Sequence, residues 1–405
     1  MIVVSQLPVW CLPVTQWVLI QVIVGLTAAF TSSQSRLRPI TLMAAIAIAY
    51  SIQSSVEKSF KSSKLAAYVS ALCWANIVNA VDILCLSRVT YTKQLEWERA
   101  TTKQDLKKSQ VLDCSKFSWG RLLWAIELPF NLRRIGTPWQ IKNIPPFYRA
   151  NSQYIPSRLE FLRYRFVVLC LALLTLGLLY GGENDESLHE MFSTEKQRAL
   201  YRGKNISAKE ALSHLSLVGS YWVSLRASHQ LLYSVCAILS VGLGMHEPAS
   251  WPLGGASPAE AWSLRRFWGF TWHQTFRKFL TSNAEFISRS VLQIPPGTIW
   301  HRYCCLILTF AISAIIHIFM DLSRAIPVHQ GGSIPFFAIN AVGIMIEDLI
   351  VHVASKVMGT KYAWWKRMIG YIWVISWLFT TMPMYYYPIG RVIIQAGERV
   401  PSLFI

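Results

Sequence analysis

His317 is the side chain whose type and position point most directly to chemistry. It lies near the end of 303–320, an uncharged run long enough to cross a membrane. An ionisable side chain at that depth is costly, so it is a functional candidate by default. A neutral imidazole there can take a proton as a general base; the alternative is a hydrogen bond between two helices. Asp321 follows four residues later on the same helical face, where it either orients the imidazole or marks the end of the helix.

A second histidine, His273, lies in the aromatic and basic stretch 262–280. Seven of these 19 residues are aromatic and four are basic, a composition typical of a helix at the headgroup level of a membrane. We expect this stretch not to span the bilayer, since each cation costs about 2.5–3.5 kcal/mol at the centre of a membrane helix. Membrane anchoring does not explain His273 and Gln274, which are therefore candidates for substrate binding. A hydrogen-bonded structural histidine is the alternative.

No motif for covalent or metal catalysis accompanies these histidines. The sequence has no GxSxG, HExxH, Walker or GxGxxG pattern. Its eight cysteines show no CxxC and lie mostly in apolar runs, so neither a disulfide framework nor a zinc site is predicted. His229 and His352 lie near the ends of apolar runs and are interpreted as helix-end anchors. The pattern indicates general acid–base chemistry at a membrane, without a metal or a bound redox cofactor.

The elements that must position these residues are membrane-spanning helices. Of the 405 residues, 53% are hydrophobic and 15% are charged, against about 25% charged in an ordinary soluble domain. A spanning helix needs about 20 mainly apolar residues. The uncharged runs that approach this length are the segment before Arg36 and the runs 39–56, 65–81, 166–182, 227–246, 303–320, 325–346 and 368–390. We therefore predict an all-α polytopic membrane protein with about eight spans (seven to nine) plus interfacial or re-entrant helices. The shorter run 211–224 is a ninth span, an interfacial helix or a re-entrant segment.

The formal net charge of +18 is unevenly distributed along the chain. The segment 91–165 contains fourteen Lys or Arg and six acids, whereas 181–214 contains five and six. Because basic loops stay on the cytoplasmic side of a membrane, we expect 91–165 in the cytoplasm and 181–214 on the opposite side. Asn205 begins an N-I-S glycosylation sequon in the second loop, which fits the endoplasmic reticulum. The positive charge fits anionic lipid and an anionic cosubstrate, and we expect no nucleic-acid partner.

Two features of the second half of the chain resemble those of a known enzyme family. S-L-R-R-F-W-G at 263–269, followed by W-H-Q at 272–274, is similar to the signature of the wax-synthase-like branch of the membrane-bound O-acyltransferases. His317 lies 44 residues after His273, late in an apolar run, where that superfamily has its catalytic histidine. The chain looks closest to the fungal members that acetylate terpenoid and meroterpenoid alcohols.

A third match lies in the basic loop. N-L-R-R-I-G-T at 131–137 is similar to the R-G-I-G element of the same branch, although Arg134 stands where that branch often has glycine. The residues after His317 are I-F-M-D, which differs from the relatives that have an acid next to the histidine. The resemblance runs from Asn131 to the C-terminus, and the earlier spans match in hydropathy only.

The resemblance implies one membrane acyltransferase domain, 1–405. Its parts would be the N-terminal spans (1–90), a basic cytoplasmic loop (91–165) and a catalytic core (166–405). The acyl group, expected to be acetyl from acetyl-CoA, would pass directly to the hydroxyl of a hydrophobic terpenoid-type secondary metabolite. Acetyl-CoA would be a cosubstrate, and the bilayer and the alcohol would be the other partners.

The resemblance also implies roles for particular residues. His317 would be the general base, and His273 would hydrogen-bond the acyl carbonyl or position a substrate. The further residues expected to bind substrate are Trp268, Trp272, Gln274, Arg265, Arg133 and Asp321. The alternative enzyme is a long-chain wax or sterol ester synthase with the same residues and a different acyl pocket. The alternative from another class is a membrane transporter or a non-catalytic scaffold.

Overall fold

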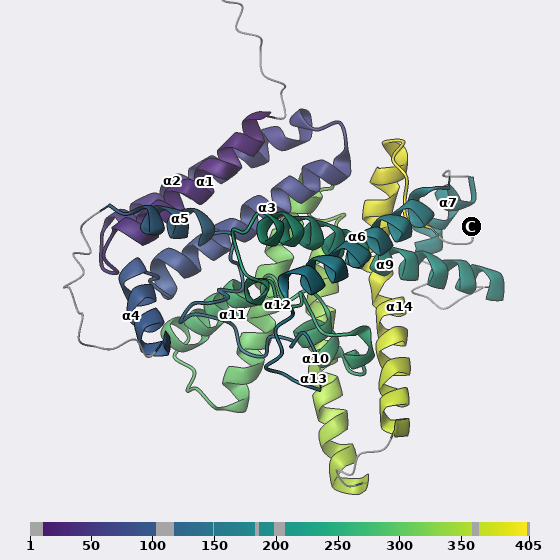
Figure 1. The fold of residues 1–405 in the computed structure, drawn as a ribbon. Helices are drawn as coiled ribbons and strands as arrows, with labels where there is room; N and C mark the ends of the chain where they lie inside the picture. The colour runs from purple at the N-terminus through teal and green to yellow at the C-terminus, as the bar shows by residue number, and fades with distance from the viewer. Residues whose placement is uncertain are drawn as a thin grey trace, which may run out of the picture. The chain divides into compact units, whose positions relative to one another are not determined.

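The computed structural model is built of helices and describes residues 11–102, 117–148, 150–182, 186–197, 207–358 and 364–402 (Figure 1). Within these ranges the sole β-type pairing is an isolated bridge between Tyr148 and Asn151, so the predicted all-α class is confirmed. The chain divides into two compact units. The first comprises Met1–Lys142 and Thr275–Ala325, and the second comprises Asn143–Gln274 and Ile326–Ile405. Each unit is therefore assembled from segments that are far apart in the sequence.

The first unit is a bundle of helices in which α1, α2 and α3 pack side by side (Figure 1). Its helices are α1 (Cys11–Phe30), α2 (Leu37–Ser59), α3 (Ser63–Val81), α4 (Tyr91–Thr102), α5 (Trp119–Glu127), α11 (Arg277–Phe286) and α12 (Ile299–Leu322). π-helical turns at Asp82–Leu86 and Ile287–Val291 continue α3 and α11. The helix α12 packs against both α3 and α11, so the segment that carries His317 is held by the N-terminal spans.

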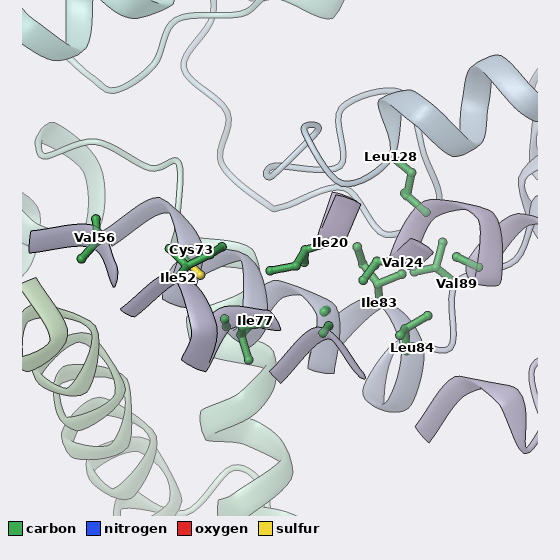
Figure 2. Packing of buried hydrophobic residues seen from close by; sticks show 14 of the residues in the cluster. Ile20, Val24, Ile52, Val56, Cys73, Ile77, Ile83, Leu84, Val89 and Leu128 are labelled. Carbon is green, nitrogen blue, oxygen red and sulfur yellow. The ribbon is translucent and has the colours of Figure 1, made fainter. Parts of the chain in front are cut away.

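Small and branched apolar side chains fill the core of this unit. Ile20, Val24, Ile52 and Ile77 point into the cluster that Figure 2 shows, and each is at most 6% exposed. Helix contacts in a membrane depend on close packing, because lipid is as apolar as the side chains. Gly25 illustrates this closeness: a Cβ there would lie 1.9 Å from the carbonyl oxygen of Ala125 in α5.

The second unit contains the longest helices of the described chain. Its helices are α6 (Arg158–Tyr180), α7 (Glu186–Met191), α9 (Ala208–Gly242), α10 (Leu264–Arg266), α13 (Ser333–Met358) and α14 (Trp364–Gln395). The capping boxes at Ser157 and Ser207 begin α6 and α9, which pack against each other. The helix α13 packs against α10 and α14, so the short helix of the 263–269 motif rests on a long apolar helix.

Six helices are long and apolar enough to cross a membrane: α1, α2, α3 with its π turn, α6, α12 and α13. The two other predicted spans, 227–246 and 368–390, fall largely within α9 and α14, so the count of about eight spans stays a prediction. The run 211–224 belongs to the same continuous helix as 227–242 and is therefore not a separate span. At 1.5 Å per residue, the 35 residues of α9 extend for about 52 Å, well beyond the apolar layer of a bilayer.

The aromatic stretch 262–280 does not form one helix. It consists of α10, a π-helical turn at Phe267–Thr271, an irregular segment at 272–276 and the first turn of α11. The expectation of one interfacial helix is therefore wrong, whereas the expectation that this stretch does not span the membrane agrees with the structure. The division between the two units falls directly after Gln274.

A buried ion network joins three segments of the first unit. The Asp82 carboxylate lies 3.4 Å from Nη2 of Arg134 and 3.7 Å from Nζ of Lys278. Ser87 donates a hydrogen bond of 2.7 Å to Asp82, and Nη2 of Arg134 also donates to the Asn79 amide oxygen at 2.6 Å. Burial lowers the pKa of Arg134 and of Lys278, while the carboxylate opposes both shifts. Asp82 thus holds two cations in an environment that disfavours charge.

The backbone at Arg134 has a conformation that favours glycine. Arg134 has a φ of 57°, in the left-handed region that glycine adopts without steric cost. Its guanidinium donates hydrogen bonds to the carbonyl oxygens of Asn131 and Leu128 as well as to Asn79. These contacts offset the strain of the left-handed backbone.

We expect Asp82→Asn to destabilise the first unit by about 3–5 kcal/mol, because it leaves the buried Arg134 and the partly buried Lys278 without a counter-charge. Thermal unfolding of the detergent-solubilised protein measures the effect. Glu57→Gln, at an exposed position near the end of α2, is the matched control and should change stability by less than about 0.5 kcal/mol. Equal melting temperatures for the Asp82 and Glu57 variants would contradict the proposed importance of this network.

Candidate active site

The imidazole of His317 is held in one tautomer by its own helix. Its Nδ1 lies 2.8 Å from the carbonyl oxygen of Ser313, one turn earlier in α12. A carbonyl oxygen only accepts hydrogen bonds, so Nδ1 carries the proton and Nε2 of the neutral ring carries the lone pair. His317 is partly buried. It therefore presents the atom that a general base requires.

The turn of α12 that follows His317 is fastened to α2 and α3. The carbonyl oxygen of Phe319 accepts a hydrogen bond of 3.2 Å from Nε2 of Gln53. The ring of Phe319 stacks on Trp74 at 3.8 Å, and the Trp74 indole donates to Oε1 of Gln53 at 2.9 Å. These contacts fix the part of α12 that carries the histidine.

Asp321, in the last turn of α12, pairs with Arg324 just beyond the end of the helix. It is 3% exposed, and its Oδ1 lies 3.9 Å from Nη1 of Arg324. The proton on Nδ1 of His317 is directed to Ser313. An orienting role of Asp321 toward His317 therefore stays a prediction, while its pairing with Arg324 neutralises a buried charge at the helix end.

In the second unit, His273 stacks on His229. The ring centroids are 4.5 Å apart and the planes differ by 20°. Nδ1 of His229 lies 2.6 Å from the carbonyl oxygen of Leu225, so it donates its proton there and Nε2 carries the lone pair. His229 lies in the interior of α9, so its interpretation as a helix-end anchor is wrong. Trp272 packs edge-on against Trp222, which lies in α9 like His229, with the ring centroids 4.6 Å apart.

Gln274 fixes the irregular segment that carries His273. Its backbone N–H donates to the carbonyl oxygen of Gly254 at 3.0 Å, and its Nε2 donates to that of Gly269 at 3.2 Å. The side chain is 2% exposed. Among the described residues, no donor reaches its Oε1, which is itself buried.

Asn340 of α13 joins two tryptophans by hydrogen bonds. Its Oδ1 accepts from the indole nitrogens of Trp268 at 3.1 Å and Trp377 at 3.2 Å. Its Nδ2 donates to the carbonyl oxygen of Phe336 at 2.8 Å, and the side chain is fully buried. Trp268 is thus held in a defined orientation by α13.

Two acidic residues of α13 hold the start of α10. The Glu347 carboxylate accepts from the backbone N–H groups of Leu264 at 2.5 Å and Arg265 at 3.1 Å, and from the Trp373 indole at 3.1 Å. A carboxylate at a helix start satisfies N–H groups that have no partner within the helix. Asp348 accepts two hydrogen bonds from the Arg265 guanidinium, at 2.9 and 2.6 Å.

The sequence-predicted residues thus fall into two groups. Trp268, Trp272, His273, Gln274 and Arg265 lie in the second unit, and His317, Asp321 and Arg133 lie in the first. Arg133 is buried in the loop after α5. Asn205, the predicted glycosylation site, lies outside the described residues.

Sequence reasoning missed four residues that position the motif: His229, Asn340, Glu347 and Asp348. Glu347 and Asp348 had a visible signal, because two adjacent acids in an apolar run require partners. Asn340 lies in an uncharged run without any such signal. Only its two indole donors reveal its role.

Comparison with known proteins relates this chain to a protein family. A family model described as the membrane bound O-acyl transferase family matches residues 251–339, which contain His273 and His317. Acetyltransferase aurG of Calcarisporium arbuscula is 31% identical over 70% of this chain and 68% of its own length. Acetyltransferase pyr8 of Aspergillus fumigatus is 29% identical, covering 78% and 73%, and acetyltransferase ataH of Aspergillus terreus is 30% identical, covering 69% and 93%. No solved structure matches the chain.

We expect Glu347→Gln to destabilise the second unit by about 1–3 kcal/mol, because an amide has one acceptor oxygen for the three donors that face it. Thermal unfolding in detergent measures the loss. Glu247→Gln is the matched control in the same unit, since Glu247 is exposed and pairs with Arg158 at the surface; it should cost less than about 1 kcal/mol. A Glu347 variant as stable as the control would show that the carboxylate does not hold α10.

Proposed function

The chain belongs to the membrane bound O-acyl transferase family, and we propose that it transfers an acetyl group from acetyl-CoA to a hydroxyl of a hydrophobic, terpenoid-type alcohol. It is an acyltransferase and an integral membrane protein, as the family match, the named relatives and six apolar helices establish. The relatives aurG, pyr8 and ataH, each named an acetyltransferase, support acetyl as the acyl group.

The tautomer of His317 is the observation that carries the proposed mechanism. With its Nδ1 proton directed to Ser313, the ring accepts a proton at Nε2. The hydroxyl oxygen of the acceptor attacks the thioester carbonyl carbon as its proton passes to Nε2 of His317. The C–S bond then breaks, and the leaving sulfur of CoA takes that proton and departs as the thiol. One imidazole thus serves as base and then as acid, and the acyl group moves directly to the acceptor.

We assign His273 to the carbonyl side of the reaction. A neutral imidazole has one N–H to donate to the thioester oxygen as negative charge develops there. The stacked ring of His229 supports this role by fixing the plane of His273. We assign Gln274, whose buried Oε1 lacks a donor among the described residues, to substrate binding through the segment that it holds together with His273.

The basic residues have less direct roles. The Arg265 guanidinium is paired with Asp348. To bind a phosphate of CoA, Arg265 would have to exchange Asp348 for the phosphate. Arg133 is the second basic candidate for binding CoA, in the loop that the charge distribution assigns to the cytoplasm.

We propose that acyl-CoA enters from the cytoplasmic side of the membrane, that Asn205 is glycosylated on the opposite side, and that the membrane is the endoplasmic reticulum. The three parts 1–90, 91–165 and 166–405 remain our proposal for the organisation of a single functional domain.

Transfer of label from acetyl-CoA to lipid-soluble alcohols tests the proposed function. Microsomes that contain the protein should acetylate members of a panel of terpenoid alcohols, and microsomes without it should not. A parallel series of acyl-CoA donors of increasing chain length should show activity falling with length. Strong preference for long-chain donors would replace the proposal with a wax or sterol ester synthase, and absence of transfer from every donor would overturn it.

Substitution of the histidines tests the assignment of roles. We expect His317→Ala to lower kcat by about 10²–10⁴-fold, the usual loss for a general base, at normal abundance in the membrane. His273→Ala should also be severe, whereas His273→Asn should retain part of the activity because an amide still donates a hydrogen bond. Asp321→Asn should have a milder effect than either. His352→Ala, at an exposed position of α13, is the control, and a near-normal rate in His317→Ala would refute the assignment.

The role of His229 is separable from that of His273. His229→Ala should reduce kcat less than His273→Ala, because it removes the stacked ring and leaves the donor. His229→Phe should recover part of that loss, since a phenyl ring can restore the stacking. If His229→Ala and His229→Phe were equally impaired, a ring nitrogen of His229 would be required and the stacking role would be wrong. Turnover of the purified variants at saturating donor decides between these outcomes.

A further inference from the structure

We propose that Glu285, His301 and Cys305 of the first unit bind a divalent ion of the zinc class. Glu285 lies on α11, and His301 and Cys305 lie one turn apart on α12. Their ligand atoms all lie within 4.8 Å of one another. The site would join the two helices near the beginning of α12, four turns before His317.

The distances match the edges of a zinc tetrahedron. With Zn–S of about 2.3 Å and Zn–N and Zn–O of about 2.0–2.1 Å, tetrahedral ligand atoms are separated by about 3.3–3.6 Å. Nε2 of His301 lies 3.0 Å from Oε2 of Glu285 and 3.8 Å from Sγ of Cys305, and this Sγ lies 3.6 Å from the same Oε2. Shifts of a few tenths of an ångström would place all three atoms around one ion.

The surroundings also fit a metal ligand. Nδ1 of His301 lies 2.9 Å from Oγ of Ser288, and metal-binding histidines commonly use their second nitrogen in such a hydrogen bond. Arg289 donates to Oε1 of Glu285 at 3.1 Å, which leaves Oε2 for the ion. The Glu285 side chain is 43% exposed and that of His301 is 12% exposed. Water can therefore reach the site and supply a fourth ligand.

A hydrogen-bond chain of Ser288, His301 and Glu285 explains part of this arrangement. It resembles a catalytic triad, but Ser288 is fully buried, so a substrate cannot reach its hydroxyl. The hydrogen-bond chain also does not explain why Sγ of Cys305 lies close to both Glu285 and His301. A carboxylate, an imidazole and a thiolate together form a ligand set that favours zinc over magnesium or calcium.

Metal analysis of the full-length protein in detergent tests this inference independently of acyl transfer. Protein expressed with added zinc and purified without chelator should contain about one zinc per chain. Cys305→Ser and His301→Ala should each lose most of it. Cys304→Ser, which changes the adjacent cysteine outside the cluster, is the matched control and should retain the ion. Replacement by Co²⁺ should give a thiolate-to-cobalt absorption band in the wild type and in Cys304→Ser, but not in Cys305→Ser.

Two results would overturn the site. One is a wild-type protein without zinc and without a cobalt band, and the other is equal zinc content in the wild type and Cys305→Ser. Size-exclusion profiles show which variants are folded. If His301→Ala does not fold, Cys305→Ser and Glu285→Gln decide the matter, because both preserve side-chain volume. A chelator should lower the melting temperature of the wild type and leave that of Cys305→Ser unchanged.

Discussion

Compensation of buried charge is the constraint on which both units depend. An apolar helical protein has little water in its interior, so each ionised side chain there needs a partner of opposite charge or several hydrogen bonds. In the first unit the Asp82 carboxylate forms ion pairs with Arg134 and Lys278, which come from segments almost 150 residues apart in the sequence. In the second unit Glu347 meets the same requirement with backbone N–H groups of α10.

These two carboxylates have different structural consequences. Asp82 brings the loop after α5 and the start of α11 to the end of α3, and thereby helps to close the first unit. Glu347 positions a single turn of helix whose own hydrogen bonds could not sustain it, because three residues are too few for a stable helix. The 263–269 motif therefore depends on α13 for its conformation. Trp268 of this motif is then oriented by Asn340, which accepts hydrogen bonds from Trp268 and from Trp377 of α14.

His317 and His229 share one hydrogen-bonding arrangement with the backbone of their own helix. In both, Nδ1 donates to the carbonyl oxygen four residues earlier, at 2.8 Å in α12 and 2.6 Å in α9. The helix itself thus fixes the tautomer, and no acidic partner is needed. If His317 is the general base that we propose, this hydrogen bond prepares its Nε2 for proton transfer, although the residue after His317 is isoleucine. Asp321 is then available to balance Arg324 at the end of the helix.

The sequence by itself determined the class of the protein and its family, and it singled out His317 and His273 as candidates for the site. Long uncharged runs predict membrane helices because spanning length and apolarity are local properties. The S-L-R-R-F-W-G and W-H-Q motifs can likewise be recognised from the sequence without knowledge of the fold. The tertiary structure decided what the sequence could not: that 211–224 continues into α9, that 262–280 is broken, that His229 stacks on His273, and that Glu347 holds α10. Each of these depends on contacts between residues far apart in the chain, or on a helix that continues past its apolar run. Periodicity and composition describe only the neighbours of a residue in sequence, so they do not contain this information.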